Sequence, residues 1–484
     1  MKLSVPFITK KNKFQFWIFI VFAALFALIS LPNHFYYRTQ WFDLGFYTNH
    51  CYHYMHLDVA HLKSALSDHF DLLLVVFSPL VYIFGTYTLL IIQIIFLLLG
   101  GYGIYLYSLQ INENKHSAHL LQILFYSSFA VFSALSFDYH SSVIGVCLIP
   151  YIFYFYYTGN KKGFILSCIL VLISKENLIL TLGFILLVLP FIHKDKPALK
   201  KLSLAFSVFS FLFFLLVVAY IMPALSETAH YANFKYTTVG GSKTFTDVMF
   251  FIIKHPVETV ELLFKNTSAN PAWNYYKVEA HIYLLICGGF LMFIRPAYFI
   301  ILLPVYIQKF LHDSENLWGL AFHYNIEFTV IIILMLAKFI SERKTAKTQL
   351  IWLYSMLFIN VILTVRLMDN TVSYIRRSTV RFYQESHYQS VYDRNEVNFM
   401  ASKIEADASL SCQSMLTPHF CLRKDIKLYD GNNENAEYIL LSDNYEPYPL
   451  SENEFNKKFK ELLRSKNYKL TYAFKNLYLF KKQF

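Results

Sequence analysis

The sequence predicts an α-helical membrane protein with many transmembrane helices and a small α/β domain at its C-terminal end. Hydrophobic residues make up 56% of its 484 residues and charged residues only 15%, whereas about a quarter of a soluble domain is charged. Apolar runs of spanning or near-spanning length recur between residues 16 and 366, and each favours a transmembrane helix. Residues 367–484 break this pattern with 17 Lys and Arg and 15 Asp and Glu, which is typical of a soluble domain.

The net charge of +11 does not indicate a nucleic-acid partner. The basic excess lies in short segments between apolar runs, where Lys and Arg set the orientation of a membrane protein. With only 15 Gly and 14 Pro, the composition also excludes collagen-like and low-complexity chains. We therefore expect membrane lipids around the protein and no nucleic-acid binding.

Four lysines precede the first apolar run, Phe16–Leu31, as in a signal peptide. No small-x-small cleavage site follows, so we expect a retained first helix. Ten further apolar runs predict helices, of which the run at 163–174 is too short to cross a full bilayer alone. These runs lie at about 86–109, 117–136, 142–158, 163–174, 177–193, 202–222, 280–294, 297–311, 322–340 and 349–366.

The distribution of Lys and Arg predicts the orientation. If 163–174 is a thin span, there are about eleven crossings, and the loops on the N-terminal side hold 15 Lys and Arg within about 43 residues. The loops on the other side, chiefly 33–71 and 223–279, hold 8 within about 113. Because basic loops stay in the cytoplasm, we expect a cytoplasmic N-terminus. The prediction is an integral protein of the plasma (inner) membrane, with a transmembrane domain over 1–366 and an extracytoplasmic α/β domain over 367–484.

The C-terminal domain shows alternating helix and strand patterns. We expect helices near 395–406 and Glu452–Lys466, strands at Ser409–Cys412, Ile426–Tyr429 and Tyr438–Leu441, and a hairpin of Lys469–Phe474 with Leu477–Phe480. Cys412 and Cys421 lie in this domain, and their spacing permits a disulfide without specifying one.

Four groups of polar residues interrupt the apolar background, and ionisable residues at membrane depth are costly and usually paired or functional. All four groups fall on the outer side in the orientation that the Lys and Arg counts predict. We therefore expect Asp43, Asp138, Lys175, Glu176 and His323 to converge on one cleft under the outer surface. The groups are Asp43 with the His-rich stretch up to Asp71, Phe137–His140, Ser174–Asn177, and His323–Glu327.

A cleft with carboxylates and cations suits group transfer, because a carboxylate can accept the proton of an attacking hydroxyl and cations can hold a leaving phosphate. No cofactor is assigned: a divalent metal is compatible with the sequence but not indicated. No metal ligand is predicted, because the repeat of His50, His53 and His56 drifts around a helix. We predict catalytic roles for Asp43 and Asp138, and substrate-binding roles for His69, His140, Lys175, Glu176, His323 and Tyr324.

Structural roles also explain several of these residues. Asp138 and His140 suit the start of a helix, where Asp is a common cap. Lys175 and Glu176 suit a mutual ion pair at a break between short helices. Asp43, a lone acid among aromatic residues, has the weakest structural explanation.

Seven short polar motifs occur in a fixed order along the chain. They are FDLG at Phe42–Gly45, HF at His69-Phe70, SP at Ser78-Pro79, DYH at Asp138–His140, KEN at Lys175–Asn177, RP at Arg295-Pro296 and HY at His323-Tyr324. Taken in order, these motifs resemble the membrane-protein family named domain of unknown function 2079. That family is grouped with the GT-C superfamily of multi-spanning glycosyltransferases. The resemblance covers most of residues 30–340 and implies a GT-C-like transmembrane fold.

The resemblance further implies a sugar donor linked to polyprenyl phosphate and an acceptor, not identified by the sequence, that arrives from outside. In GT-C enzymes an acid of the first external loop acts as base or organiser, and Asp43 is the matching residue. Asp138 matches an acid of the second external loop. The charge and position of Lys175 suit the donor phosphate.

A non-catalytic membrane binding protein or a transporter is the alternative function. A transporter is expected to show inverted repeats and ionisable residues near the membrane midplane. The sequence shows no internal repeat, and its polar groups fall on one predicted side. We therefore predict a membrane glycosyltransferase with three kinds of partner: a lipid-linked sugar donor, an unknown acceptor and membrane lipids.

Overall fold

A computed structural model describes residues 13–226, 234–373, 375–390, 392–432, 435–443 and 447–483. The chain divides into two compact units, each described here by itself. The first holds most of the apolar helices and comprises 1–27, 63–73 and 93–380. The second comprises 28–62, 74–92 and 381–484. The predicted boundary after residue 366 falls within helix α19 (Ala346–Asp369).

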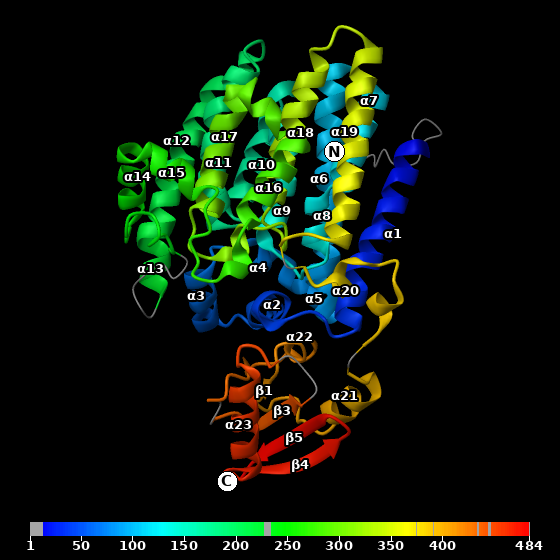
Figure 1. The fold of residues 1–484 in the computed structure, drawn as a ribbon, viewed down its shortest axis with the longest axis vertical. Helices are drawn as coiled ribbons and strands as arrows, with labels where there is room; N and C mark the ends of the chain where they lie inside the picture. Colours follow the sequence, from blue (N-terminus) through cyan, green and yellow to red (C-terminus); the bar gives the residue numbers. More distant parts are fainter. Residues whose placement is uncertain are drawn as a thin grey trace. The chain divides into compact units, whose positions relative to one another are not determined.

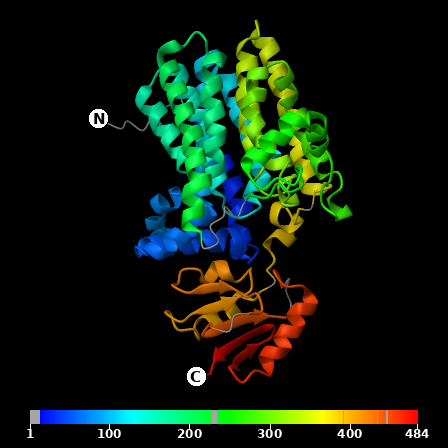
Figure 2. The ribbon, with the colours of Figure 1, turned by 90° about the vertical axis from the view of Figure 1, so that its left-hand side faces the viewer.

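The apolar runs form helices at the predicted places (Figures 1 and 2). Within the first unit α11 packs against both α12 and α17, and α9 packs against α10 and α18. The helices are α1 (Lys13–Phe35), α6 (Thr88–Asn112), α7 (Lys115–Tyr126), α8 (Phe129–Leu135), α9 (Ser141–Thr158), α10 (Lys161–Leu172), α11 (Glu176–Ile192), α12 (Lys200–Leu216), α13 (Met222–Leu225), α16 (Tyr276–Ile286), α17 (Pro296–Phe310), α18 (Ile326–Ser341) and α19.

Five helical segments of the described chain are long and apolar enough to cross a membrane, and a sixth is the bent pair α7 and α8. The helices α11 and α17 are apolar but shorter. The count of eleven crossings goes beyond these segments and stays a prediction, as does the orientation. Residues 1–12, which hold three of the four lysines before the first helix, lie outside the described residues.

The predicted run 117–136 is broken between α7 and α8 by a bend of 45°. The break releases backbone carbonyls, which are costly to leave unpaired in an apolar interior. Asn360 donates to the Leu124 carbonyl at 3.1 Å, and Thr364 donates to the Ser127 carbonyl at 2.8 Å. Two polar side chains of α19 therefore compensate the break.

The second unit contains the predicted α/β domain, with a five-stranded sheet in the order β2-β1-β3-β5-β4. The central strand β3 pairs in parallel with β1 and antiparallel with β5, and β1 pairs in parallel with β2. Every predicted element is present, although the first helix is shorter than expected. The elements are α21 (Arg394–Ala401), β1 (Leu410–Cys412), α22 (Thr417–Phe420), β2 (Ile426–Leu428), β3 (Tyr438–Ser442), α23 (Glu452–Leu463), β4 (Tyr468–Phe474) and β5 (Leu477–Lys482).

Both faces of this sheet are covered, because side chains of β3 alternate between two apolar clusters. Ile439 and Leu441 pack with Phe455 of α23 on one face, and Figure 2 shows α23 lying along the sheet. Leu440 packs on the other face with residues of α21 and α22 and with Tyr37 from the segment after α1. Cys412 and Cys421 are both buried free thiols, so the disulfide that the spacing permits is not formed.

Candidate functional site

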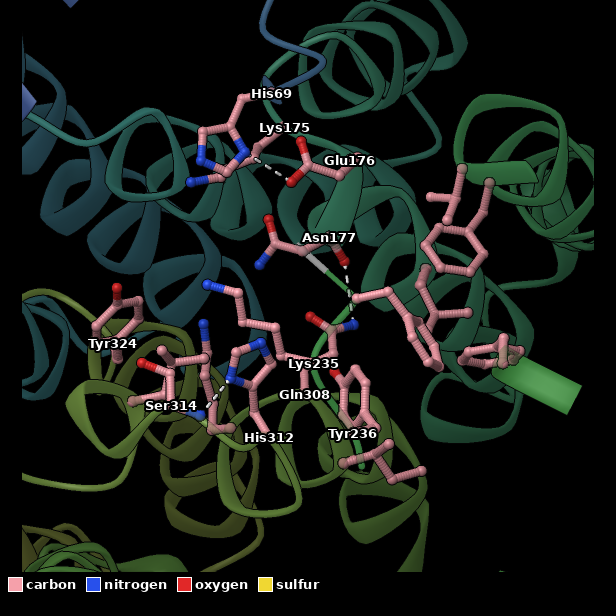
Figure 3. Close-up of a pocket in the computed structure, with 18 residues that line it drawn as sticks. His69, Lys175, Glu176, Asn177, Lys235, Tyr236, Gln308, His312, Ser314 and Tyr324 are labelled. Atoms are coloured by element: carbon pink, nitrogen blue, oxygen red, sulfur yellow. Dashed lines mark hydrogen bonds and ion pairs between the residues drawn. The ribbon is translucent and has the colours of Figure 1, made fainter. Parts of the chain in front are cut away.

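The first unit contains a pocket of about 280 Å³ between the start of α11, the end of α17 and the segment around residue 235. Four predicted substrate-binding residues line it: His69, Lys175, Glu176 and Tyr324. In Figure 3, His69, Lys175 and Glu176 lie on one side of the pocket, Tyr236, His312 and Ser314 lie on the opposite side, and Asn177 lies between them. Of the residues expected to converge on one cleft, Lys175 and Glu176 line this pocket, whereas Asp43, Asp138 and His323 are not among its lining residues.

His69 and Glu176 form a buried pair across 107 positions of sequence. The Nδ1 atom of His69 lies 2.9 Å from Oε1 of Glu176, and the backbone N–H of Phe70 donates to Oε2 at 3.0 Å. Glu176 is the first residue of α11, where the helix dipole favours an anion. A carboxylate that accepts from Nδ1–H fixes the ring and makes Nε2 its basic atom, and this Nε2 lies 4.0 Å from Oδ2 of Asp68. This is the arrangement of an oriented general base.

A second ion pair joins α17 to α18. The Nζ atom of Lys309 lies 2.8 Å from Oε1 of Glu327, and both side chains are almost completely buried. Asn177 donates to the same Glu327 oxygen at 3.1 Å, and the Lys309 ammonium lies 4.8 Å from the ring centre of Tyr324. A buried charge is tolerated when it is paired and hydrogen-bonded, so this group fixes one wall of the pocket.

Two lysines of the pocket lack such partners. Lys175 and Lys235 line it, and the side chain of neither makes a hydrogen bond or an ion pair with any described residue. Lys175 is half-buried and Lys235 is exposed. The one carboxylate among the lining residues belongs to Glu176, which His69 already engages. The pocket therefore has an excess of positive charge, which favours an anionic ligand.

The remaining wall of the pocket is apolar. Phe214 of α12, Val218 of the π-helical turn Val217–Ile221, and Phe245 line this side. Leu180, Phe234, Ile307 and Leu317 complete it. On α12 the neighbouring residues Leu212 and Leu216 are exposed, at 63% and 47%. An apolar wall next to a lipid-facing helix suits a ligand that has a hydrocarbon chain as well as a charged group.

His140 and His323 come together beside the pocket rather than in its lining. Their rings stack with centres 3.4 Å apart. Burial is the main cause that lowers the pKa of His140 well below its ordinary value, and the positive charge of Lys175 lowers it further. The side chain of Gln93 bridges two backbone groups of the turn before α9. It donates to the Asp138 carbonyl at 2.8 Å and accepts from the His140 N–H at 2.9 Å.

Asp138 is buried, at 6% exposure, with a positive φ of 31°. A positive φ is uncommon for a residue other than glycine and marks a constrained turn. Asp138 does not belong to the pocket lining, and its catalytic role stays a prediction.

Asp43 belongs to the second unit, in the π-helical turn Trp41–Gly45. This turn packs on α22, and the Trp41 N–H donates to Ser414 Oγ at 3.2 Å. The following helix α2 (Phe46–Met55) is tied to the same domain, because Asn49 donates to the Cys421 carbonyl at 2.8 Å. The segment that carries Asp43 is therefore held by the α/β domain, and its catalytic role stays a prediction.

The His-rich stretch forms contacts among its own side chains in the second unit. His50 Nδ1 lies 2.5 Å from His61 Nε2, and His53 stacks on His61 with ring centres 3.6 Å apart. His53 Nδ1 also lies 3.0 Å from Asp58 Oδ2. Among the described residues, no group of three or more His, Cys, Asp or Glu side chains is arranged to hold a metal ion.

A family model described as predicted membrane protein (DUF2079) matches residues 33–479. The chain belongs to the DUF2079 family. The match includes both compact units apart from the first helix and the last few residues. No curated protein matches the chain.

In this DUF2079 chain, sequence reasoning missed several pocket residues. Lys309 carried a usable signal, because a lysine within the apolar run 297–311 is costly unless it is paired. Lys235 carried none, since it is an ordinary lysine in a long polar segment. The others are the neighbour of Lys235 in the polar segment and three residues of α17 and the segment after it, and no pattern of spacing links them to the KEN motif. They are Tyr236, Gln308, His312 and Ser314.

Proposed function

We propose that the protein is a membrane glycosyltransferase of GT-C type, which takes its sugar from a polyprenyl-phosphate donor. The observation that carries the proposal is the pocket, where two lysines without anionic partners lie next to an apolar wall. A polyprenyl phosphate combines an anion with a long hydrocarbon chain. Among ligands of a membrane protein, it matches both halves of this lining.

The charges of the pocket support a phosphate ligand. Lys309 is neutralised by Glu327 and Glu176 is engaged by His69, so Lys175 and Lys235 remain to meet an anion. Asn177 adds an amide at the same end of α11. In the proposed complex Lys175 and Lys235 hold the phosphate, and they stabilise the charge that develops on it as the sugar leaves.

The His69 and Glu176 pair supplies the proton acceptor for a single inverting displacement. The acceptor hydroxyl gives its proton to Nε2 of His69, and its oxygen attacks the anomeric carbon of the sugar. The bond between that carbon and the phosphate oxygen breaks, and polyprenyl phosphate leaves with the electron pair. Glu176 stabilises the imidazolium that forms, as an acid behind a catalytic histidine does.

The resemblance assigns the base role to Asp43 and an accompanying role to Asp138. These assignments and the pocket make different predictions for single variants. Loss of His69 would remove the base of the pocket, whereas loss of Asp43 would remove the base that the resemblance predicts. The activity of each variant distinguishes them.

The test uses the purified full chain in nanodiscs. Polyprenyl-phosphate mannose, glucose, galactose and aminoarabinose would each be supplied together with a cell-envelope extract as acceptor source. Mass spectrometry would measure the free polyprenyl phosphate that is released. Release from at least one donor above a protein-free control supports the proposal. No release, together with no saturable binding of polyprenyl phosphate, would overturn it.

A further inference from the structure

Two short helices between α13 and α16 expose a large apolar surface. They are α14 (Phe245–Lys254) and α15 (Pro256–Leu262), and they pack against each other. One side of the pair is buried, where Val248 and Leu262 pack with Leu311. The other side is not covered by any described residue. It consists of Phe250, Ile253, Val257, Val260 and Phe264, which are 56%, 71%, 73%, 56% and 47% exposed.

The exposed apolar residues share one face of each helix. At about 100° per residue, the partly exposed Met249 and the exposed Phe250 and Ile253 of α14 point into one sector, which also contains Thr246 and is separate from that of the buried Val248. Asp247 and Lys254 occupy a narrow polar stripe beyond it. The helix α15 repeats this pattern. Its residues Val257 and Val260 form the exposed apolar face, with Glu258 and Glu261 at the edge.

This pattern fits lipid better than water. A surface helix of a soluble protein has one apolar stripe toward the core and polar residues on the opposite face. On α14 the polar stripe is narrow and most of the circumference is apolar, and a helix that is apolar around most of its circumference is buried in protein or in a membrane. An apolar patch of this kind marks an interaction surface.

The pair lies against a helix that has an exposed apolar surface of its own. The helix α12 lies in the candidate membrane span Pro197–Leu225. Its Phe214 contacts Phe245 at the start of α14, with ring centres 5.8 Å apart. Leu212 of α12 and Tyr220 just beyond it are exposed at 63% and 69%. A membrane around α12 would therefore reach the start of α14.

We propose that α14 and α15 are embedded in membrane lipid, with Ile253 and Val257 among acyl chains and Lys254 at the polar edge. The occupant of this surface is lipid, because the pair contacts a candidate span and Lys254 follows the apolar face along its edge, with its ammonium 5.7 Å from the ring centre of Phe250. The inference does not need the proposed function. If a polyprenyl chain does enter the pocket, Phe245 lies where that chain would leave the bilayer, since this residue lines the pocket and begins α14.

The test compares neighbouring positions on α14. Ile253→Cys and the matched control Lys254→Cys would each be labelled with the fluorophore NBD in the full chain, in nanodiscs. Val257→Cys provides a second apolar position in case the first variant fails to fold, and size-exclusion chromatography checks folding. The unsubstituted protein, labelled in parallel, gives the background from native thiols such as the half-buried Cys287. Quenching would be measured with nitroxide-labelled phospholipids and with aqueous iodide.

Embedding predicts that the fluorophore at residue 253 or 257 is quenched several-fold more by nitroxide lipid than by iodide, and that the label at Lys254 shows the reverse preference. Equal quenching of the two α14 labels by iodide, with no effect of nitroxide lipid on either, would overturn the proposal. Neither result depends on a sugar donor or on transfer activity. The outcome is therefore independent of the proposed glycosyltransferase function.

Discussion

Replacing Lys175 with Met is expected to weaken the binding of polyprenyl phosphate. Lys175 lines the pocket at the start of α11, and its ammonium has no anionic partner among the described residues. Methionine keeps much of the side-chain length and removes the charge. The variant therefore tests the positive charge itself, while the His69 and Glu176 pair next to it keeps its hydrogen bonds.

The size of the effect follows from the position of Lys175. Two unit charges 4 Å apart interact by about 4 kcal/mol at the effective dielectric constant of about 20 near a protein surface. Part of this interaction energy is offset by the cost of removing water from the half-buried ammonium of Lys175. A hydrogen bond to a charged group contributes about 1.5–3 kcal/mol net. That range corresponds to an increase of about 10- to 150-fold in Kd.

The assay titrates undecaprenyl phosphate into the protein in nanodiscs and measures binding by native mass spectrometry. Lys254→Met is the matched control, because it removes the same charge from an exposed lysine outside the pocket lining. Lys175→Arg keeps the charge and should retain most of the affinity. An unchanged Kd for Lys175→Met, or an equal loss in Lys254→Met, would refute the assignment of the pocket as a phosphate site.

Four further predictions concern other parts of the chain. His69→Gln should lower the rate of sugar transfer by about 10²–10⁴-fold, and Glu176→Gln should lower it by less. In both variants the Kd for polyprenyl phosphate should be nearly unchanged. Full turnover in a folded His69→Gln protein would exclude His69 as the base. Asp43→Asn should cause a similar loss only if the base implied by the resemblance is correct, so the same assay on both variants decides between them. A reporter enzyme that is active only after export, fused to the C-terminal end of residues 367–484, should be active. An inactive reporter that remains in the cytoplasm would reverse the predicted orientation. Burial is the main cause that lowers the pKa of His61 from 6.5 to about 4, and the charge of His53 is the second cause. The folded state therefore binds fewer protons than the unfolded state between these pH values, and thermal stability should fall as the pH drops from about 6.5 to 4. His61→Gln should flatten this pH dependence, and an unchanged slope in the variant would contradict the prediction.

The helices and strands were predictable because each depends on a local pattern. Apolar runs such as 349–366 require no knowledge of their neighbours, and the result is α19. The C-terminal hairpin was equally predictable, because segments with alternating apolar and polar residues flank the short turn at Lys475-Asn476. These segments form β4 and β5. In both cases the period of the hydrophobic residues determines the element.

The pairing of polar side chains was only partly predictable. His69 and Glu176 were both expected at the site, but their direct bond joins residues 107 positions apart and depends on how the helices pack. Lys175 and Glu176 were alternatively interpreted as a mutual ion pair. Instead Glu176 pairs with His69, and Lys175 has no ion pair to a described residue. Helix packing, rather than neighbourhood in sequence, determines which charge of the pocket remains uncompensated.

The packing of the α/β domain was also beyond the sequence pattern. Tyr37 and the turn that carries Asp43 form part of the compact unit of residues 381–484, although more than 300 positions separate them in sequence. Neither segment has a periodic pattern that would assign it to a sheet domain. Asn49 makes this connection through hydrogen bonds to backbone carbonyls, and a single amide in a segment predicted as a loop gives no such signal.

The release of polyprenyl phosphate from a polyprenyl-phosphate sugar tests the central claim most directly. Wild-type protein and the His69→Gln and Lys175→Met variants would be compared in nanodiscs with each donor and the envelope extract. The glycosyltransferase account predicts release by the wild type, a loss of about 10²–10⁴-fold for His69→Gln, and a raised KM for Lys175→Met. Wild-type protein that releases nothing from any donor and binds no polyprenyl phosphate would contradict the account.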